Sequence, residues 1–403
     1  MKAFLLTFLL GTGAALGQSA RPLETSPALA WKFQTRGAVI GSPLVRDNVA
    51  YFGSTDSICY AVDLATGALK WQRRTGGPIK STPATGSSSL LYLNGGDGLV
   101  YALDRATGKV RWRFGTLGGV LGERKYDFAD YHHASPTLHG DTLFVGSGDG
   151  RVYALDAQTG RALWNFATND IVHATPVADG SRVFVSSFDG HLYTLDRRDG
   201  RLLWRFKSVG HRYFPKGEMQ GAPVLGNGLV YAGSRDYNLY ALDAQGGFGH
   251  WTKSFPQGWA LALTARDTVL YVGTSDDKVL AALDGRTGRE LWRTDAKFNV
   301  FGGCAFGPTT VHFGTLMGKI FGLDQKTGAV RWVFATEGYR QHRARYFKPD
   351  DTFRDDIRSV IGSYDEFLVM YLRLGAVFSA PVVVGNRLLA GSADGAVYCL
   401  ESR

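Results

Sequence analysis

Short runs that alternate between apolar and polar residues recur along this chain, and each run ends at an acidic residue followed by a turn. One copy, Arg151–Asp156, reads RVYALD, an alternation that is typical of a β-strand with one buried face. The eleven residues Ala154–Trp164 then follow the pattern A-x-D-x-x-T-G-x-x-x-W, in which a polar turn leads to a tryptophan. A pattern that recurs at a fixed period indicates an array of one structural unit. The seven copies lie at Ala61–Trp71, Ala102–Trp112, Ala154–Trp164, Thr194–Trp204, Ala241–Trp251, Ala282–Trp292 and Gly322–Trp332.

Each residue type in the pattern has a structural use. The Asp accepts hydrogen bonds from backbone N–H groups just after it, the Gly supplies a positive φ, and the Trp brings a large apolar surface with one N–H donor. The pattern therefore predicts a hairpin with a polar turn, and a structural role for its members. These are Asp63, Trp71, Asp104, Trp112, Asp156, Trp164, Asp196, Trp204, Asp243, Trp251, Asp284, Trp292, Asp324 and Trp332, with Trp31 near the start of the chain.

The spacing of these residues predicts a closed ring. From each Trp the next unit usually begins 12 residues on, its Asp follows after 20 or 21 more, and its Trp stands 8 residues later. Such a unit holds four short strands. The last unit begins at Pro381 and ends at Arg403 without a Trp, while the strand Ala28–Gln34 carries an extra one. We expect an all-β fold: an eight-bladed β-propeller of four-stranded antiparallel blades, in which the N-terminal strand closes the last blade.

The seven copies resemble the tryptophan-docking motif of the pyrroloquinoline quinone (PQQ) propellers, and the resemblance covers almost the whole chain after residue 17. That group is similar to the eight-bladed quinoprotein alcohol dehydrogenases and to the BamB-type outer-membrane assembly factors. The resemblance implies the eight-bladed fold and two kinds of function, either partner binding by a scaffold or oxidation by a bound quinone. A single fold can host both.

The first residues have the form of a secretory signal peptide, which predicts a periplasmic or secreted protein. Lys2 precedes the apolar run Ala3–Leu10, and the small residues Ala15 and Gly17 suit cleavage before Gln18. We divide the chain into a signal peptide, residues 1–17, and a PQQ-like propeller, residues 18–403. The apolar run is too short to span a bilayer. A lipoprotein would have Cys at the position of Gln18, so we expect no membrane span and no lipid anchor, in contrast with BamB-type lipoproteins.

Charge and cysteine content narrow the classes of partner. The formal net charge of +9 is compatible with anionic ligands, but it is not concentrated in a lysine-rich arm, so no nucleic-acid partner is expected. The three cysteines are Cys59, Cys304 and Cys399. The repeat places Cys59 and Cys399 in the third strands of neighbouring blades, pointing to the same side. We therefore favour three buried free thiols over a disulfide.

Three connections between blades exceed the usual 12 residues, and these insertions comprise residues 115–133, 207–220 and 337–378. Antiparallel alternation puts all three on the face of the ring opposite the Asp turns. Loops on a rigid scaffold commonly carry binding and catalysis, so we expect this inserted face to be the functional one.

The third insertion is expected to be partly helical and to lie before the eighth blade. Its apolar residues recur at helical spacing between Phe353 and Tyr371. Thr352 with Asp355 resembles a capping box, Gly362-Ser363 favours a break between two helices, and Gly375 favours a stop. Either these helices cap the channel mouth or their apolar stripe packs on the propeller face.

The residue three positions before the start of each unit is expected near the ring centre. On four consecutive blades it is polar (Lys80, His133, His173 and Gln220), and on the other four it is apolar (Ile40, Ala260, Phe301 and Phe378). This asymmetry predicts a one-sided pocket for an amphipathic ligand. Including the Arg, His and Tyr residues of the insertions, the candidate ligand-binding residues are Lys80, Arg124, Tyr131, His132, His133, His173, Gln220, Arg340, His342, Arg343 and Arg345.

These residues leave alternatives open. Arginine forks suit carboxylate or phosphate groups, but the acidic residues that follow the third basic stretch, Asp350, Asp351, Asp355 and Asp356, would neutralise it if the charges pair within the insertion. His132, His133 and His173 have no metal-ligand spacing, so neither a metal site nor a catalytic residue is predicted.

Two functions follow. The first is an exported binding or scaffold protein that uses its inserted face for an envelope protein or a small anionic ligand. The second, implied by the resemblance, is a PQQ-dependent oxidoreductase of the alcohol or sugar dehydrogenase kind, with Ca²⁺. In it the quinone carboxylates would be held by Lys80, Arg124 and Arg340 or Arg343, beside His133 and His173. The chain has no adjacent Cys pair and no C-x-x-C-H haem site, and these departures favour the first function.

Overall fold

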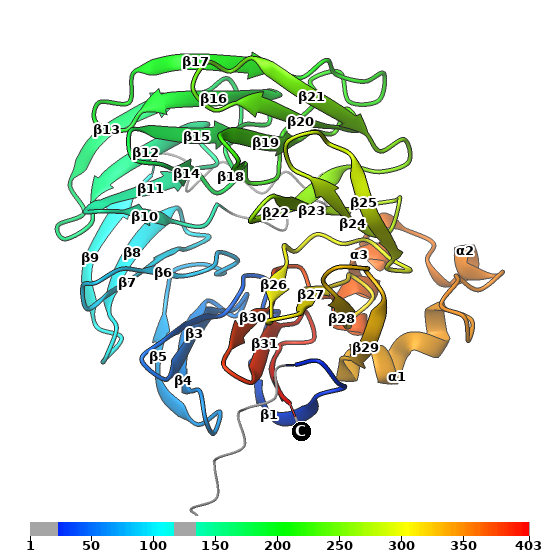
Figure 1. The fold of residues 1–403 in the computed structure, drawn as a ribbon. Coiled ribbons are helices and arrows are strands. Elements are labelled where there is room, and N and C mark those ends of the chain that lie inside the picture. Colours follow the sequence, from blue (N-terminus) through cyan, green and yellow to red (C-terminus); the bar gives the residue numbers. More distant parts are fainter. Residues whose placement is uncertain (1–22, 117–133, 403) are drawn as a thin grey trace, which may run out of the picture.

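The computed structural model describes residues 23–116 and 134–402, which form eight four-stranded antiparallel sheets arranged in a ring (Figure 1). In seven sheets the strands follow one another along the chain, and in the eighth the order is β1-β32-β31-β30. The predicted eight-bladed propeller is confirmed.

Each blade runs from an inner to an outer strand. Blades 1 to 4 consist of β2 (Leu44–Arg46), β3 (Val49–Gly53), β4 (Ile58–Asp63), β5 (Leu69–Arg74); β6 (Ala84–Thr85), β7 (Leu90–Asn94), β8 (Leu99–Asp104), β9 (Val110–Gly115); β10 (Thr137–His139), β11 (Thr142–Gly146), β12 (Arg151–Asp156), β13 (Ala162–Ala167); and β14 (Val177–Ala178), β15 (Arg182–Ser186), β16 (His191–Asp196), β17 (Leu202–Lys207). Blades 5 to 8 consist of β18 (Val224–Gly226), β19 (Leu229–Gly233), β20 (Asn238–Asp243), β21 (Gly249–Ser254); β22 (Ala260–Arg266), β23 (Val269–Thr274), β24 (Val279–Asp284), β25 (Glu290–Asp295); β26 (Ala305–Phe306), β27 (Thr310–Gly314), β28 (Lys319–Asp324), β29 (Val330–Ala335); and β30 (Val382–Val384), β31 (Arg387–Gly391), β32 (Ala396–Glu401), β1 (Ala28–Gln34).

The first strand closes the ring as the missing tryptophan predicted. β1 pairs antiparallel with β32, with Trp31 opposite Cys399 and Phe33 opposite Val397, and the two ends of the chain's folded part lie side by side in Figure 1. The Thr35 N–H also donates to the Gly395 carbonyl at 2.8 Å. Closure leaves no free edge between the first and last blades.

The Asp turns join neighbouring blades through the motif tryptophans. Asp63 Oδ1 accepts the N–H groups of Ala65 and Thr66, each at 3.0 Å. Gly67 then has a φ of +74°, and a Cβ there would lie 2.8 Å from the Trp31 ring, so only glycine lets the indole of the preceding blade approach. The same contact recurs at each of the seven motif glycines. The Thr of the pattern is less regular, because Asp199 and Gly246 replace it in blades 4 and 5.

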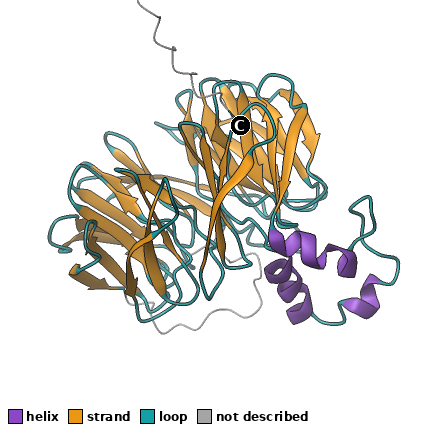
Figure 2. Ribbon diagram, turned by 90° about the horizontal axis from the view of Figure 1, so that it is seen from below, coloured by secondary structure: helices purple, strands orange, loops and turns teal. Residues whose placement is uncertain are grey.

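The third insertion contains three helices, α1 (Glu337–Tyr346), α2 (Ile357–Val360) and α3 (Tyr364–Leu374). The predicted break and stop are confirmed: Ser363 caps α3 by accepting the Glu366 N–H, and Gly375 ends it in the left-handed conformation with φ +67°. Figure 2 shows the helices together on one side of the strands.

One expectation for this insertion was wrong, and one helix was not predicted. Thr352 is not a helix cap, because its N–H and hydroxyl both donate to Asp350 Oδ1 in a turn, and α2 begins only at Ile357. The basic stretch, for which no helix was predicted, forms α1. Thr336 caps this helix by accepting the Tyr339 N–H at 3.2 Å, and it ends with Arg343 and Arg345, whose charges suit a helix C-terminus.

All three cysteines are buried and free, as predicted. Cys59 lies in β4 of blade 1 and Cys399 in β32 of blade 8, which are the third strands of neighbouring blades.

Candidate functional site

An Asp–Tyr pair with a buried Tyr secures six of the eight blades on the inserted face. In the turn between second and third strands, an Asp accepts the hydroxyl of a Tyr four residues on, as Asp56 does from Tyr60 at 2.8 Å. The same carboxylate accepts an N–H of the segment that leads into its own blade from the preceding blade, such as the Arg36 N–H at 3.0 Å. The pairs are Asp56–Tyr60, Asp97–Tyr101, Asp149–Tyr153, Asp189–Tyr193, Asp236–Tyr240 and Asp394–Tyr398.

Blades 6 and 7 lack this pair. In blade 6 Ala281 stands where the Tyr would be, and Asp277 Oδ2 is buried without a hydrogen-bond partner among the described residues. Burial raises the pKa of Asp277. In blade 7 Met317 and Phe321 occupy the two positions, and Met317 is fully buried.

The helices pack where the pair is missing. Met317 belongs to a cluster that contains Ile40, Phe301 and Phe378, three of the four apolar residues expected at the ring centre, together with apolar residues of α1 and α3. Tyr371 of α3 lies 6.3 Å from Phe378, measured between ring centroids. The apolar side of the insertion is therefore packed on the propeller face, against residues that were expected at the ring centre. Ala260 instead lies in the core between blades 5 and 6.

The blade 8 pair also holds the start of α1. The Tyr398 hydroxyl accepts the Glu337 N–H at 2.8 Å, and Asp394 Oδ2 accepts the Gly338 N–H at 3.2 Å. Thr336 joins α1 to α3, because its hydroxyl donates to the Leu374 carbonyl at 2.9 Å. These contacts fix the helices to blades 7 and 8.

A polar cluster that contains Gln220 borders the same apolar cluster beside blade 5, because Trp259 belongs to that apolar cluster and Phe214 packs against it. Gln220 Oε1 accepts from Arg235 Nε at 3.0 Å, and both side chains are buried. The Arg235 guanidinium lies 4.6 Å from the Trp259 ring and 5.3 Å from that of Phe214. Gln220 Nε2 is buried without a partner among the described residues. The planar guanidinium of Arg235 is therefore held by two cation–π contacts beside the Gln220 amide.

Sequence reasoning missed Arg235 and Trp259. Arg235 precedes the paired Asp236, and the corresponding residue in the other blades is Thr55, Gly96, Gly148, Phe188, Asp276, Leu316 or Ala393. The single cation in that column was a usable signal. Trp259 stands directly before Ala260, one of the residues expected at the ring centre, but the sequence analysis did not single it out.

The other candidates on this side are only partly described. His173 lies edge-on to Phe188, with ring centroids 5.5 Å apart, and Lys80 is half-buried before β6. The remaining four candidates of the first insertion lie outside the described residues: Arg124, Tyr131, His132 and His133. So do residues 1–17, the predicted signal peptide.

The basic residues of α1 are largely engaged within the insertion. Arg343 Nε donates to Asp351 Oδ1 at 3.3 Å and its Nη2 to the Lys348 carbonyl at 2.8 Å. Asp351 also pairs with Lys319 and accepts the Tyr339 hydroxyl. Burial alone would raise the pKa of Asp351, but these partners outweigh it and lower the pKa, so the carboxylate stays charged.

Arg340 and Arg345 lie over the rings of Phe334 and Tyr346, at 5.1 and 5.8 Å from the ring centroids, and His342 is half-buried between them on α1. These residues sit on blades 7 and 8, whereas Lys80, His173 and Gln220 precede blades 2, 4 and 5.

The described members of the proposed quinone-binding set are Lys80, His173, Arg340 and Arg343, and they come from several blades. Arg343 is held by Asp351, Arg340 stacks on Phe334, and Lys80 belongs to another blade. Among the described residues no three His, Cys, Asp or Glu side chains converge as a metal site would require. The described helices also include none with the length and apolar character needed to cross a membrane.

Comparison with known proteins gives a consistent picture. A family profile described as outer membrane protein assembly factor BamB matches residues 24–116, 96–215 and 214–345. The chain is 26% identical over 198 residues to the outer membrane protein assembly factor BamB of Burkholderia pseudomallei (strain K96243), a match that spans 47% of this chain and 42% of that protein.

Two solved structures share the fold. BamB from Moraxella catarrhalis superposes with a TM-score of 0.68 at 20% identity, covering 93% of this chain and all of that one. Quinohemoprotein alcohol dehydrogenase from Comamonas testosteroni gives the same TM-score at 14% identity, covering 95% of this chain and 78% of that one. At these identities the likeness concerns the fold alone.

Proposed function

Because the chain belongs to the family described as outer membrane protein assembly factor BamB, we propose that it is an exported scaffold that binds an envelope protein through its inserted face. The proposed place of action is the periplasm. The observation that carries the proposal is that large apolar side chains of the insertions are exposed on this face. Val209 and Tyr213, in the second insertion, are 78% and 65% exposed, although both are large apolar side chains.

The helical insertion adds a second apolar surface to the same face. Tyr364, Val369 and Leu372 of α3 are each more than a third exposed, while Met370, Tyr371 and Leu374 are buried against the propeller. Apolar side chains held outward on a rigid support are typical of protein-binding surfaces. We name Val209, Tyr213, Val369 and Leu372 the docking residues.

The test is site-specific photo-crosslinking in the host envelope. A photoreactive phenylalanine replaces Tyr213 or Leu372, and the control replaces Leu69, which is 47% exposed on the outer strand β5. We expect one adduct of the same mass from positions 213 and 372 and none from 69, and Tyr213→Ser with Leu372→Ser should abolish capture of that protein. Equal adducts from all three positions, or none from 213 and 372, would refute the proposal.

The quinoprotein alternative is supported by fold similarity to the alcohol dehydrogenase and opposed by the contacts that engage Arg340 and Arg343 within the protein. It predicts that PQQ with Ca²⁺ raises the melting temperature and gives a bound-quinone absorbance band. Addition of both to purified protein distinguishes the two functions, because the scaffold proposal expects neither change.

A further inference from the structure

Trp204 differs from the other seven motif tryptophans in its indole N–H. Those seven donate Nε1–H to a backbone carbonyl at 2.9–3.1 Å: Trp31, Trp71, Trp112, Trp164, Trp251, Trp292 and Trp332. In six cases the acceptor is the residue after the motif Asp of the next blade. That residue for Trp204 is Ala244, yet Trp204 Nε1 is buried with no acceptor among the described residues.

Arg182 bonds the carbonyl that Trp204 would be expected to use. Its Nη1 donates to the Ala244 carbonyl at 2.6 Å, while Nε and Nη2 donate to Asp179 Oδ2 at 3.0 and 2.7 Å. A guanidinium has five N–H donors. These three bonds leave two of them without an acceptor among the described residues.

The boundary between blades 8 and 1 provides a matched comparison. Arg387 occupies the position of Arg182 there, and its Nη1 donates to the Leu64 carbonyl at 2.7 Å. Trp31 nevertheless donates to the same carbonyl at 3.0 Å. An arginine at this position therefore does not by itself displace the indole, and the boundary between blades 4 and 5 has a feature of its own.

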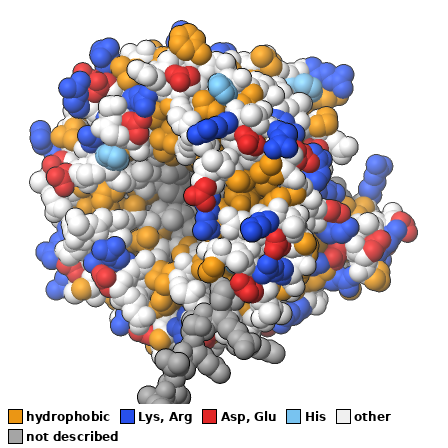
Figure 3. All heavy atoms as spheres, viewed as in Figure 1, with side chains coloured by type: hydrophobic (Ala, Val, Ile, Leu, Met, Phe, Trp, Pro, Cys, Tyr) orange, Lys and Arg blue, Asp and Glu red, His pale blue; other side chains and the backbone are white. Residues whose placement is uncertain are grey.

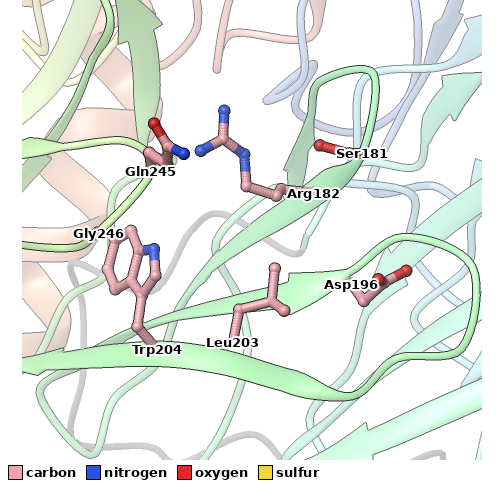
Figure 4. Close-up of a pocket in the computed structure, with 7 residues that line it drawn as sticks. All are labelled: Ser181, Arg182, Asp196, Leu203, Trp204, Gln245 and Gly246. Carbon is pink, nitrogen blue, oxygen red and sulfur yellow. The ribbon is translucent and has the colours of Figure 1, made fainter.

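That feature is a pocket of about 560 Å³ beside Trp204, on the face that carries the Asp turns (Figure 4). Figure 4 shows Arg182, Leu203 and Trp204 around a common space, with Gln245 and Gly246 of blade 5 beside Trp204. Its lining residues are Ser181, Arg182, Asp196, Leu203, Trp204, Gln245 and Gly246.

The sequence departs from the repeat at this pocket. Asp199 and Gly246 replace the motif Thr in the two adjacent turns, as noted above. Phe248, two residues after Gly246, is 76% exposed, whereas the corresponding positions in the other six copies are Ala68, Lys109, Arg161, Arg201, Arg289 and Ala329. An aromatic ring is thus held in solvent at the rim.

The carboxylate that lines the pocket is already engaged within the protein. This carboxylate, Asp196, is bonded by Arg198 at 3.3 and 3.1 Å, and this contact lowers the pKa of Asp196. Arg197 Nε donates to the Gly180 carbonyl, next to Ser181, at 3.1 Å. The walls formed by Leu203 and the Trp204 ring are apolar.

We propose that this pocket binds an acidic–apolar segment of a partner polypeptide. A side-chain carboxylate of the segment bonds Arg182, and the neighbouring apolar side chain lies against Leu203, Trp204 and Phe248. An arginine fork matches a carboxylate in geometry and charge. This site lies on the face opposite the docking residues and does not depend on the proposed function.

The test uses the indole N–H resonances of the ¹⁵N-tryptophan-labelled full chain, with Trp204 assigned by its loss in Trp204→Phe. The probe is the blocked peptide acetyl-Gly-Phe-Asp-Gly-amide, and its matched control has Asn in place of Asp. We expect a saturable shift of the Trp204 resonance alone, and an affinity about tenfold lower for the Asn peptide and for Arg182→Gln.

Arg387→Gln is the matched control variant and should bind the probe as the unaltered protein does. Unchanged resonances of the other tryptophans show that Arg182→Gln is folded. No shift of Trp204 with millimolar probe, equal binding of the Asn peptide, or shifts spread evenly over several indoles would each overturn the proposal.

Discussion

Blade 1 and blade 7 share one end and differ at the other. On the side of the Asp turns, Asp63 and Asp324 accept the same backbone N–H groups, and Gly67 and Gly328 have φ of +74° and +72°. At the other end, blade 1 has the pair Asp56–Tyr60, while blade 7 has Met317 and Phe321 in its place and is followed by three helices.

The comparison indicates that the end with the Asp turns holds the ring together, whereas the opposite end carries the insertions. The Asp turn and its tryptophan hold each blade to the next, so they are kept wherever the ring must close. The opposite end is secured by a replaceable Asp–Tyr pair, and where that pair is lost in blade 7 an apolar cluster forms that supports an insertion.

Both signs of charge are interspersed over the face opposite the helices in Figure 3.

The largest expected effect concerns the shared end. Trp332 of blade 7 is only 4% exposed, and its Nε1 donates to the Leu23 carbonyl at 2.9 Å. Trp332→Ala should lower the free energy of unfolding by about 3–5 kcal/mol, because it leaves a large cavity. Urea denaturation measures this, with Val333→Ala as the exposed control. If the two variants differed by less than ~1 kcal/mol, the shared end would not be what holds the blades.

The second effect exists in blade 7 but not in blade 1. His312 is stacked on Trp332 at 5.2 Å between centroids, in the position of Tyr51 on Trp71. Burial lowers the pKa of His312 from 6.5 to about 4. The unfolded chain therefore binds a proton at a pH where the folded chain does not, so stability is complete above 6.5 and falls as the pH drops toward about 4.

The expected loss over that window is about 3 kcal/mol. His312→Phe, which copies Phe144 and Phe184 at the same repeat position, should remove this part of the pH dependence. Denaturation curves across the window measure it, and an unchanged slope in the variant would assign the dependence to other groups.

The third effect concerns the helices that blade 1 lacks. Asp351 has a φ of +66°, which Asn tolerates, so Asp351→Asn removes the charge without straining the backbone. Lys319 and Arg343 then lose their shared carboxylate, and stability should fall by about 2 kcal/mol. Asp355→Asn is the control, since Asp355 is 90% exposed and pairs with Lys348. Faster hydrogen exchange in α1 should accompany the first change alone.

The smallest effect extends the comparison to blade 4. Trp71→Phe removes an indole hydrogen bond to the Arg105 carbonyl, whereas Trp204→Phe removes an N–H that has no acceptor among the described residues. Trp71→Phe should therefore cost about 1 kcal/mol more. Equal costs would mean that Trp204 Nε1 is satisfied in solution.

The sequence predicted the parts of the molecule that repeat. Trp31 and Pro381 together indicated the closing strand, and Gly375 indicated the end of α3, because backbone requirements of this kind act on single residue types. The α1 helix was missed because its residues were interpreted only by their charge, and Thr336 was not considered as a helix cap. Gln220 was placed at the ring centre, but its contact with Arg235 was not predicted, because Arg235 is a single exception in its repeat column. The missing acceptor of Trp204 Nε1 could not be predicted, because it depends on the position of one atom and not on a residue type.

Hydrogen exchange of the protein in complex with the partner identified by crosslinking tests the central claim most directly. If the inserted face is the binding surface, amides in residues 207–214 and in α3 should become protected, while the seven Asp turns keep their rates. Protection confined to the Asp turns, with the insertions unchanged, would contradict the account.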